Sequence, residues 1–418
     1  MSCASPIQSS FPIELIEEIL DYFDYLPDKD IQRILDCPSE GYKCGRVAVL
    51  TSCSLVSRAW LPRSRYHLFG SVRLSPKNHA RFLPLVTSPL CSFLNSVREL
   101  VLTEEDREET IDYNDPEGDY WIHRVLPNFA LSIFPRIRLL TITAARFDYM
   151  SKGNFSKMLN HLSGPTTITH LAIRHCMFRK QDQLIQALSS VKSSDCVCLQ
   201  SPTLRVIPER DDKTQSQILT PTLSPSFSSL MINIDSTQSI VWMARIIPVA
   251  GVSLKRLSIT LRPDLAATWD YCMDDFYNAL NFDRHPNLKT IAFDSLSLGT
   301  RADGLEGRMK TSHVPAILRK ITTSSIRQVI LTLTDTSSSL KDLDDLNSVD
   351  WASISEVLSQ ENYSKLEEVT ILGVNSHLID EAMDIIMDGM KELLEKNLSV
   401  NLVLSSSRGP VMIPLLGG

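Results

Sequence analysis

Cysteine and histidine side chains are the residues of this sequence that could bind a zinc ion. Three groups qualify by residue type: Cys37 with Cys44, Cys196 with Cys198, and His170 with His175 and Cys176. Six residues separate the first pair, whereas paired ligands of structural zinc sites are usually about two to four apart. The second pair alternates along an expected strand, and the third group lacks the further ligands of a tetrahedral site. We therefore expect buried structural side chains or neutral surface, with no metal and no cofactor.

Signature motifs of enzymes are missing from the sequence. It has no Walker A motif, no GxGxxG, no GxSxG and no HExxH, the spacings that bind phosphates or dinucleotides, activate a serine or hold a catalytic zinc. Carboxylates are abundant, but no pair is singled out as a general acid and base. The sequence predicts no catalytic residue and no enzymatic activity. The alternative is a hydrolase or transferase with an unrecognised α/β fold, whose mark would be a deep pocket with converging polar groups.

The composition is typical of a soluble globular protein. The chain has 418 residues, of which 43% are apolar, and a formal charge of −7, so it can build a large core and has no basic excess for nucleic acid. Nine cysteines do not form the even, dense set of a secreted disulfide framework. No signal segment or long apolar run is present. We expect a cytoplasmic or nuclear protein without membrane partners, and a solvated loop at the acidic residues 104–119.

Two separated segments near the N-terminus predict helices. The first opens with Phe11 and Pro12, and proline fits a first helical turn because its missing N–H has no partner there. The second has apolar residues at helical spacing on one face: Val49, Cys53, Val56 and Trp60. Leu61-Pro62 predicts the end of this helix, since a residue before proline disfavours the α region. Alternation around Val72 and Leu74 then predicts a short strand.

These two segments resemble the F-box, most closely that of fungal F-box proteins. They read FPIELIEEIL and SCSLVSRAWLPRSRYHLF, which match the family's Leu-Pro-x-Glu-Leu-type first helix and Val-x-Arg-x-Trp-type second helix. The resemblance covers about the first seventy residues. It implies a small helical domain, expected over residues 1–80, that binds the adaptor subunit of an SCF-type (cullin-RING) ubiquitin ligase. By their match to the motif, the adaptor-binding residues are Phe11, Pro12, Leu15, Ile16, Ile19, Leu20, Val56 and Trp60.

The segment between the two helices departs from the family. Residues 24–46 are polar, contain Pro and Gly, and predict an inserted loop. Lengthening a loop to this extent costs only about 1.2 kcal/mol of closure entropy, so the insert need not break the domain. It can nevertheless obstruct or extend the adaptor surface. A non-catalytic scaffold whose degenerate F-box has lost adaptor binding is therefore the alternative function.

A short pattern, apolar-x-x-apolar-x-apolar, recurs along residues 81–418. It starts at Val97, Ile137, Ile168, Phe227, Leu254, Leu288, Ile326 and Leu366, with a weaker unit at 196–200 and a last strand at 400–404. Helical patterns lie between these strands, among them WASISEVL at 351–358. The alternation predicts a leucine-rich-repeat-like α/β solenoid with a curved parallel sheet, which follows the all-α F-box domain. An ordinary doubly wound α/β domain is the alternative, because the asparagine that typically follows the strand is missing.

In five of the eight units a cation follows the first apolar position. These residues are Arg98, Arg138, Lys255, Lys289 and Arg327. Stacked units would align them in a column on or beside the concave face, where they are candidate target-binding residues for an acidic partner. The alternative is that they keep an exposed edge soluble. Together, the two regions predict a substrate-receptor subunit whose F-box binds the adaptor and whose repeats bind an unknown target protein.

Overall fold

The computed structural model describes the chain from residue 50 onward, with gaps. The described residues are 50–56, 58, 60–104, 120–163, 167–191, 194–200, 203–204, 227–234, 240, 243, 246–261, 277, 280, 282–297, 313–334, 346, 349–375, 379–396, 398–405 and 411–415. The predicted first F-box helix, with its six adaptor-binding residues at positions 11–20, and the insert at 24–46 lie outside these ranges.

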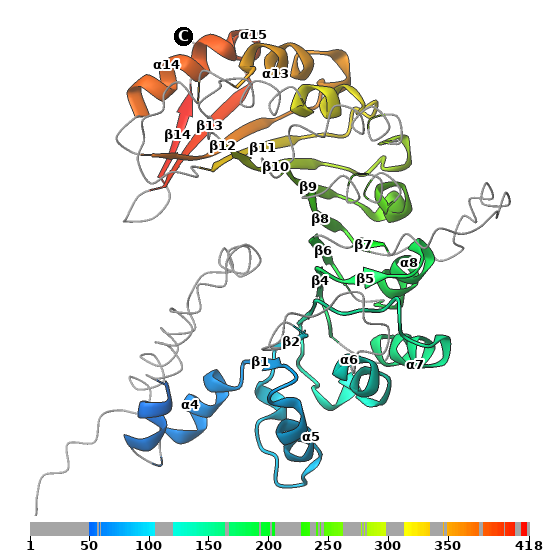
Figure 1. Cartoon of the computed structure of the whole chain (residues 1–418). Coiled ribbons are helices and arrows are strands. Elements are labelled where there is room, and N and C mark those ends of the chain that lie inside the picture. Colours follow the sequence, from blue (N-terminus) through cyan, green and yellow to red (C-terminus); the bar gives the residue numbers. More distant parts are fainter. Residues whose placement is uncertain are drawn as a thin grey trace, which may run out of the picture.

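In the described part of the chain, a large sheet of twelve strands runs through the molecule (Figure 1), and two short strands, β5 (Met177–Phe178) and β7 (Thr203–Leu204), form a second sheet. The strands of the large sheet are β1 (Ser71–Leu74), β2 (Glu99–Thr103), β3 (Leu139–Thr143), β4 (His170–Arg174), β6 (Cys196–Gln200), β8 (Ser229–Ile234), β9 (Arg256–Leu261), β10 (Thr290–Ser297), β11 (Gln328–Thr334), β12 (Glu368–Asn375), β13 (Ser399–Ser405) and β14 (Val411–Leu415). They lie side by side in chain order. All neighbours pair in parallel except β13 and β14, which are antiparallel.

This strand order decides between the two predicted architectures. A doubly wound sheet reverses its strand order at a switch point, whereas this sheet adds each new strand to the same edge. The predicted leucine-rich-repeat-like solenoid is therefore confirmed. Every predicted repeat unit, including the weak one at 196–200, supplies one of its strands.

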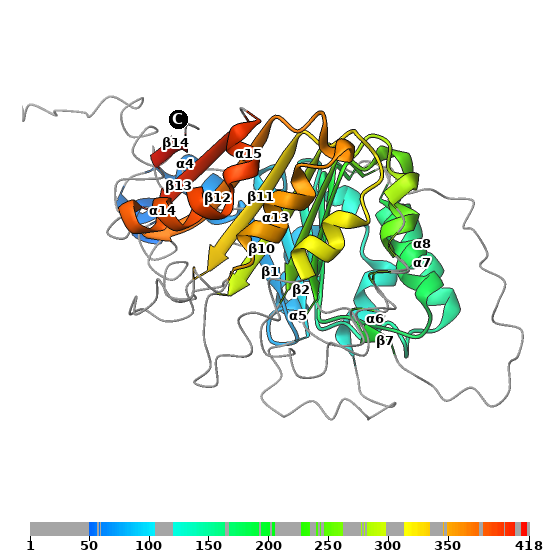
Figure 2. The ribbon, with the colours of Figure 1, turned by 90° about the horizontal axis from the view of Figure 1, so that it is seen from above.

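Helices lie on the outer side of the curved sheet. The α-helices are α4 (Leu61–Leu68), α5 (His79–Thr87), α6 (Trp121–Val125), α7 (Lys152–Leu162), α8 (Gln181–Ser190), α13 (Trp351–Leu358), α14 (Ile379–Gly389) and α15 (Lys391–Glu395), and residues 313–319 are also helical. Figures 1 and 2 show α7, α8 and α13 outside the arc of strands, while α4 lies at its N-terminal end near β1. Short 3₁₀ turns, η4 (Ile247–Ser253) and η6 (Phe282–Arg284), lie before β9 and β10.

The apolar positions of the repeat build the core between sheet and helices. In the unit that starts at Ile137, the side chains of Ile137, Leu140 and Ile142 are buried. Strand register places equivalent residues of successive units next to one another, so that Leu100 faces Leu140 and Leu140 faces Leu171. Because the side chains of a strand alternate between its two faces, the residues between these positions form columns across the inner face of the sheet.

The chain around Pro62 differs from the prediction. Residues 50–56 are helical, but the helix does not run on to Leu61. Pro62 instead lies in the first turn of a new helix, α4, preceded by Trp60 in the α region at φ −80° and ψ −23°. A proline stops one helix or starts another on the same physical grounds, its absent N–H and fixed φ, and here it starts one. The predicted strand at Val72 and Leu74 is confirmed as β1.

The acidic run that begins at Glu104 was predicted to be solvated, and for its first residue this is wrong. Glu104 is buried, and its Oε1 accepts a hydrogen bond of 3.0 Å from the backbone N–H of Ile122. Trp121 donates from Nε1 to the carbonyl of Thr103 at 3.0 Å beside it. The carboxylate thus serves a backbone donor in the first turn of α6. Residues 105–119 lie outside the described ranges.

Candidate binding surfaces

One backbone ladder connects the second residues of the repeats. Each donates its N–H to the carbonyl of its counterpart in the preceding unit, at 2.7–3.0 Å. Read along the sheet, the column is Arg98, Arg138, Thr169, Asp195, Ser228, Lys255, Lys289, Arg327 and Glu367. The structure thus places all five sequence-predicted cations in a single column.

The five cations have different surroundings. Arg98 lies over the ring of Tyr66, with 4.5 Å between the guanidinium carbon and the ring centroid. Arg138 is separated from the later cations by three other residues of the column. Lys255, Lys289 and Arg327 come from consecutive units and are all exposed. The column is therefore cationic chiefly in one stretch, beside β9, β10 and β11.

Two further features determine the charge of this stretch, the ion pair of Arg327 and the position of Arg256. Nη1 of Arg327 lies 2.6 Å from Oε1 of Glu367, in an ion pair whose side chains are about half exposed. Such surface pairs contribute at most about 1 kcal/mol to stability. Arg256, the first residue of β9, lies on the inner face because the next residue, Leu257, is buried in the core.

A polar network occupies the inner face at the C-terminal end of the solenoid. Glu368 accepts hydrogen bonds from Gln328 Nε2 at 3.0 Å, Asn401 Nδ2 at 2.7 Å and Thr370 Oγ1 at 2.9 Å. Asp294 accepts from Thr332 Oγ1 at 3.1 Å and from Ser258 Oγ. Neutral donors from neighbouring strands, and Thr370 from the same strand as Glu368, thus satisfy both carboxylates. The arrangement forms a hydrogen-bonding surface and contains no activated acid–base pair.

The cysteines of the repeats are free thiols in structural settings. Burial raises the pKa of the Cys196 thiol, more than a hydrogen bond with Ser229 and the charge of Arg256 lower it, so this thiol is a weak nucleophile. Cys176 is buried, and its Sγ donates to the carbonyl of Ile142 at 3.3 Å. Among the described residues, no group of three or more His, Cys, Asp or Glu side chains could hold a metal ion.

In one repeat, Cys176 takes the place of the asparagine that typically follows the strand of a leucine-rich repeat. Counted from Ile168, it occupies the position that leucine-rich repeats fill with Asn or Cys. Its hydrogen bond to the strand of the preceding unit is the contact that a side-chain donor makes at this place. The spacing from Ile168 to Cys176 was the signal in the sequence that could have identified this role.

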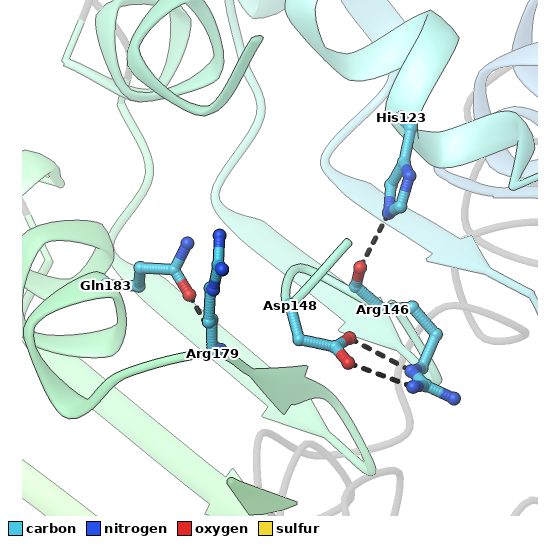
Figure 3. A network of polar contacts seen from close by, with 5 residues as sticks. All are labelled: His123, Arg146, Asp148, Arg179 and Gln183. Carbon is cyan, nitrogen blue, oxygen red and sulfur yellow. Dashed lines mark hydrogen bonds and ion pairs between the residues drawn. The ribbon is translucent and has the colours of Figure 1, made fainter. Parts of the chain in front are cut away.

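Figure 3 shows a buried ion pair that sequence reasoning missed. Arg146 Nε and Nη2 donate to the two carboxylate oxygens of Asp148 at 3.0 and 2.9 Å. Burial lowers the pKa of Arg146, but the hydrogen bond and charge of Asp148 raise it above its ordinary value. His123 Nε2 lies 2.7 Å from the Arg146 carbonyl. Because the pair lies in the turn after β3 and is buried, it fixes that turn and is not a surface for a partner.

The second F-box-like segment contributes both core and surface. Leu50 is buried, and Cys53, Trp60 and Leu68 pack against it. Val56, predicted on the same face as Cys53 and Trp60, is instead 64% exposed. The prediction of a single buried face is therefore wrong for Val56, and Trp60 lies beyond the helix that contains Cys53 and Val56. Leu55, which is 82% exposed, lies next to Val56 and extends the apolar surface.

Aromatic contacts attach this N-terminal part to the solenoid. The ring of Tyr66 contacts two guanidinium groups, that of Arg63 at 5.0 Å and that of Arg98 at 4.5 Å. Phe69 stacks on Phe93 with their centroids 4.2 Å apart. Both contacts join α4 or its end to residues around the start of β2. The exposed Leu55 and Val56 therefore belong to a segment anchored on the first repeats.

Fold and surface together define a leucine-rich-repeat-like solenoid protein with an N-terminal helical extension. Among solved structures, the leucine-rich repeat-containing protein LegL7 from Legionella pneumophila is similar at 12% identity, over 83% of this chain and 89% of that chain, with a TM-score of 0.38. No protein-family model matches the chain, and no curated protein sequence does. None of the helices in the described ranges has the length and apolar character needed to cross a membrane.

Proposed function

We propose that the protein is the substrate-receptor subunit of an SCF-type ubiquitin ligase. The observation that carries this proposal is the exposed apolar pair Leu55 and Val56, on the second F-box-like segment and anchored to a solenoid. Leu55 and Val56 are adjacent in the sequence and both largely exposed. Their place on a segment that resembles an adaptor-binding motif supports a partner surface there. In this role the chain is not an enzyme, and its partners are the adaptor subunit and a target protein.

The receptor would act through proximity. Its N-terminal segment binds the adaptor, and its inner sheet face binds the target. Holding both raises the effective concentration of target lysines near the ubiquitin-charged subunit, while the chemistry stays in that partner. The polar side chains of the inner face, such as Gln328 and Asn401, supply hydrogen-bonding groups for target recognition.

Co-purification with the adaptor subunit tests the proposal. The wild-type chain should bind the adaptor, and a variant with Pro12→Ala and Leu15→Asp should not, while the solenoid keeps its circular dichroism spectrum. Val56→Asp should also reduce binding, because it puts a charge into the apolar surface. Leu90→Asp is the matched control, since Leu90 is 89% exposed but lies outside the F-box-like segment. Undiminished adaptor binding by the first variant would contradict the assigned surface.

A non-catalytic scaffold without adaptor binding is the second candidate. It is favoured by one observation, the packing of Trp60 against the buried Leu50, because a motif tryptophan used in a core is less available to a partner. The same experiment separates the two candidates. A folded wild-type chain that does not bind the adaptor would identify the scaffold.

A further inference from the structure

We infer that Lys255, Arg256, Lys289 and Arg327 form a cationic patch that binds a short acidic segment of a partner protein. We call these four residues the β9–β11 patch. The inference rests on the proposed function in one respect, that the partner is the target of the receptor. It deepens that function by giving the target a chemical character.

The backbone holds these cations close together. The N–H of Lys289 donates to the carbonyl of Lys255, and the N–H of Arg327 donates to the carbonyl of Lys289, both at 2.8 Å. Neighbouring strands lie about 4.8 Å apart, so the three residues of the column stand at successive steps of that size. Arg256 adds a fourth cation on the inner face, beside Thr290 of the next strand.

Placing these like charges close together costs free energy, and the edge of the sheet could be kept soluble without that cost. Like charges opposite each other on adjacent strands destabilise a sheet. Thr169 and Ser228 occupy the same column elsewhere and keep the edge polar without charge. Within the described part of the chain, neither Lys255 nor Lys289 forms an ion pair, while Arg327 pairs with Glu367. A chain with a net charge of −7 thus places four cations together, of which Arg327 has a carboxylate partner. Carboxylates of a partner protein would relieve the repulsion between them.

The neighbours of the patch limit the size of its ligand. Asp195 lies two positions before Lys255 in the column, and Glu367 directly follows Arg327. A long polyanion would therefore meet a carboxylate on either side of the patch. The column from Lys255 to Arg327 spans about 10 Å, which about three or four residues of extended chain cover. The ligand that fits is therefore a short run of Asp or Glu, and nucleic acid is the less suitable anion.

Fluorescence anisotropy with the full chain tests this inference. The probe is a labelled peptide of about twelve residues with about four consecutive glutamates, compared with the same peptide carrying glutamines. We expect the glutamate peptide to bind, and Lys255→Glu with Lys289→Glu to weaken it about tenfold or more. Arg138→Glu is the matched control, because it reverses an exposed cation of the same column outside the patch. Its effect should be small.

Further measurements keep the result interpretable. If the charge-reversed double variant does not fold, Lys255→Gln with Lys289→Gln should still weaken binding. Equal binding of the glutamine peptide, an equal loss in Arg138→Glu, or tighter binding of single-stranded DNA would overturn the inference. Adaptor co-purification should be unchanged in the double variant. Conversely, if wild-type chain fails to bind the adaptor but binds the glutamate peptide, the proposed ligase function fails and the patch stands.

Discussion

The guanidinium of Arg98 lies 4.5 Å from the ring centroid of Tyr66, and this contact joins helix α4 to the first parallel strands. Arg98 was predicted as a target-binding residue from its place in the repeat. The structure gives it a second role, because its cation lies over an aromatic face contributed by the N-terminal extension. The extension and the solenoid thus meet through a specific contact.

Replacing Tyr66 tests the strength of that contact. Tyr66→Ala removes the ring that Arg63 and Arg98 contact and should destabilise the protein by about 0.5–2 kcal/mol, the range of cation–π interactions. Tyr66→Phe keeps a ring and should cost less. Urea unfolding followed by circular dichroism measures both. Equal stability of the alanine variant and the wild type would show that the contact contributes nothing.

Replacing glycine by alanine should have opposite effects on stability at Gly389 and at Gly153. A Cβ at Gly389 would overlap the Cβ of the buried Trp351, so Gly389→Ala should cost about 1–3 kcal/mol through overpacking. A Cβ at Gly153, in the first turn of α7, meets nothing within 4 Å. Gly153→Ala should therefore stabilise by about 0.4–1 kcal/mol. A thermal unfolding midpoint that does not fall in Gly389→Ala would contradict the packing of α14 on α13. One that does not rise in Gly153→Ala would contradict the open setting of Gly153.

Because Arg146 and Asp148 form a buried ion pair, substitutions at the two positions should have strongly non-additive effects on stability. Either Arg146→Met or Asp148→Leu leaves one charge buried without its partner and should cost about 3–5 kcal/mol. The double variant removes both charges and should lose clearly less than the two single losses added together. A double-mutant cycle in denaturant measures this difference. Additive losses would mean that the two groups do not act as a pair.

The burial of His285 should make the stability of the protein depend on pH. Its imidazole is buried, and Nδ1 donates to the carbonyl of Gly251 at 2.7 Å. Burial lowers its pKa below the ordinary value of 6.5, more than the carbonyls of Gly251 and Ile247 raise it. Below pH 6.5 the unfolded chain therefore binds a proton that the folded chain does not, and stability falls as the pH falls through this range.

Comparison with His285→Asn isolates this contribution. The amide can still donate to Gly251 but does not titrate. Between pH 7.5 and 5.5 we expect the unfolding midpoint of the wild type to fall further than that of the variant. Parallel midpoints over this range would assign the pH dependence to other groups.

The repeat pattern located the strands because it describes the core directly. Residues such as Leu140 and Leu257 must be apolar to lie between sheet and helices, and this requirement recurs in every unit. The order of strands then follows from the chain, since each unit can bury its apolar face only against its neighbours.

Single contacts were less predictable than the repeat. The pairing of Arg146 with Asp148 depends on a turn whose conformation the apolar pattern does not encode. The burial of Glu104 depends on the start of α6, far along the chain. Pro62 was read as a helix end because both roles of proline share one signal. The adaptor-binding assignment stays a prediction, since most of its residues precede residue 50.

Because each repeat adds one strand to the same edge of the sheet, the number of repeats sets distances along the solenoid. Six steps separate β1, beside the N-terminal extension, from β9, where the cationic patch begins. At about 4.8 Å a step, this sets a separation of roughly 29 Å along the sheet. An extra repeat between β1 and β9 would lengthen this separation by about 4.8 Å and leave both ends unchanged. The number of repeats, more than the composition of any one of them, thus sets how far the β9–β11 patch lies from the N-terminal extension.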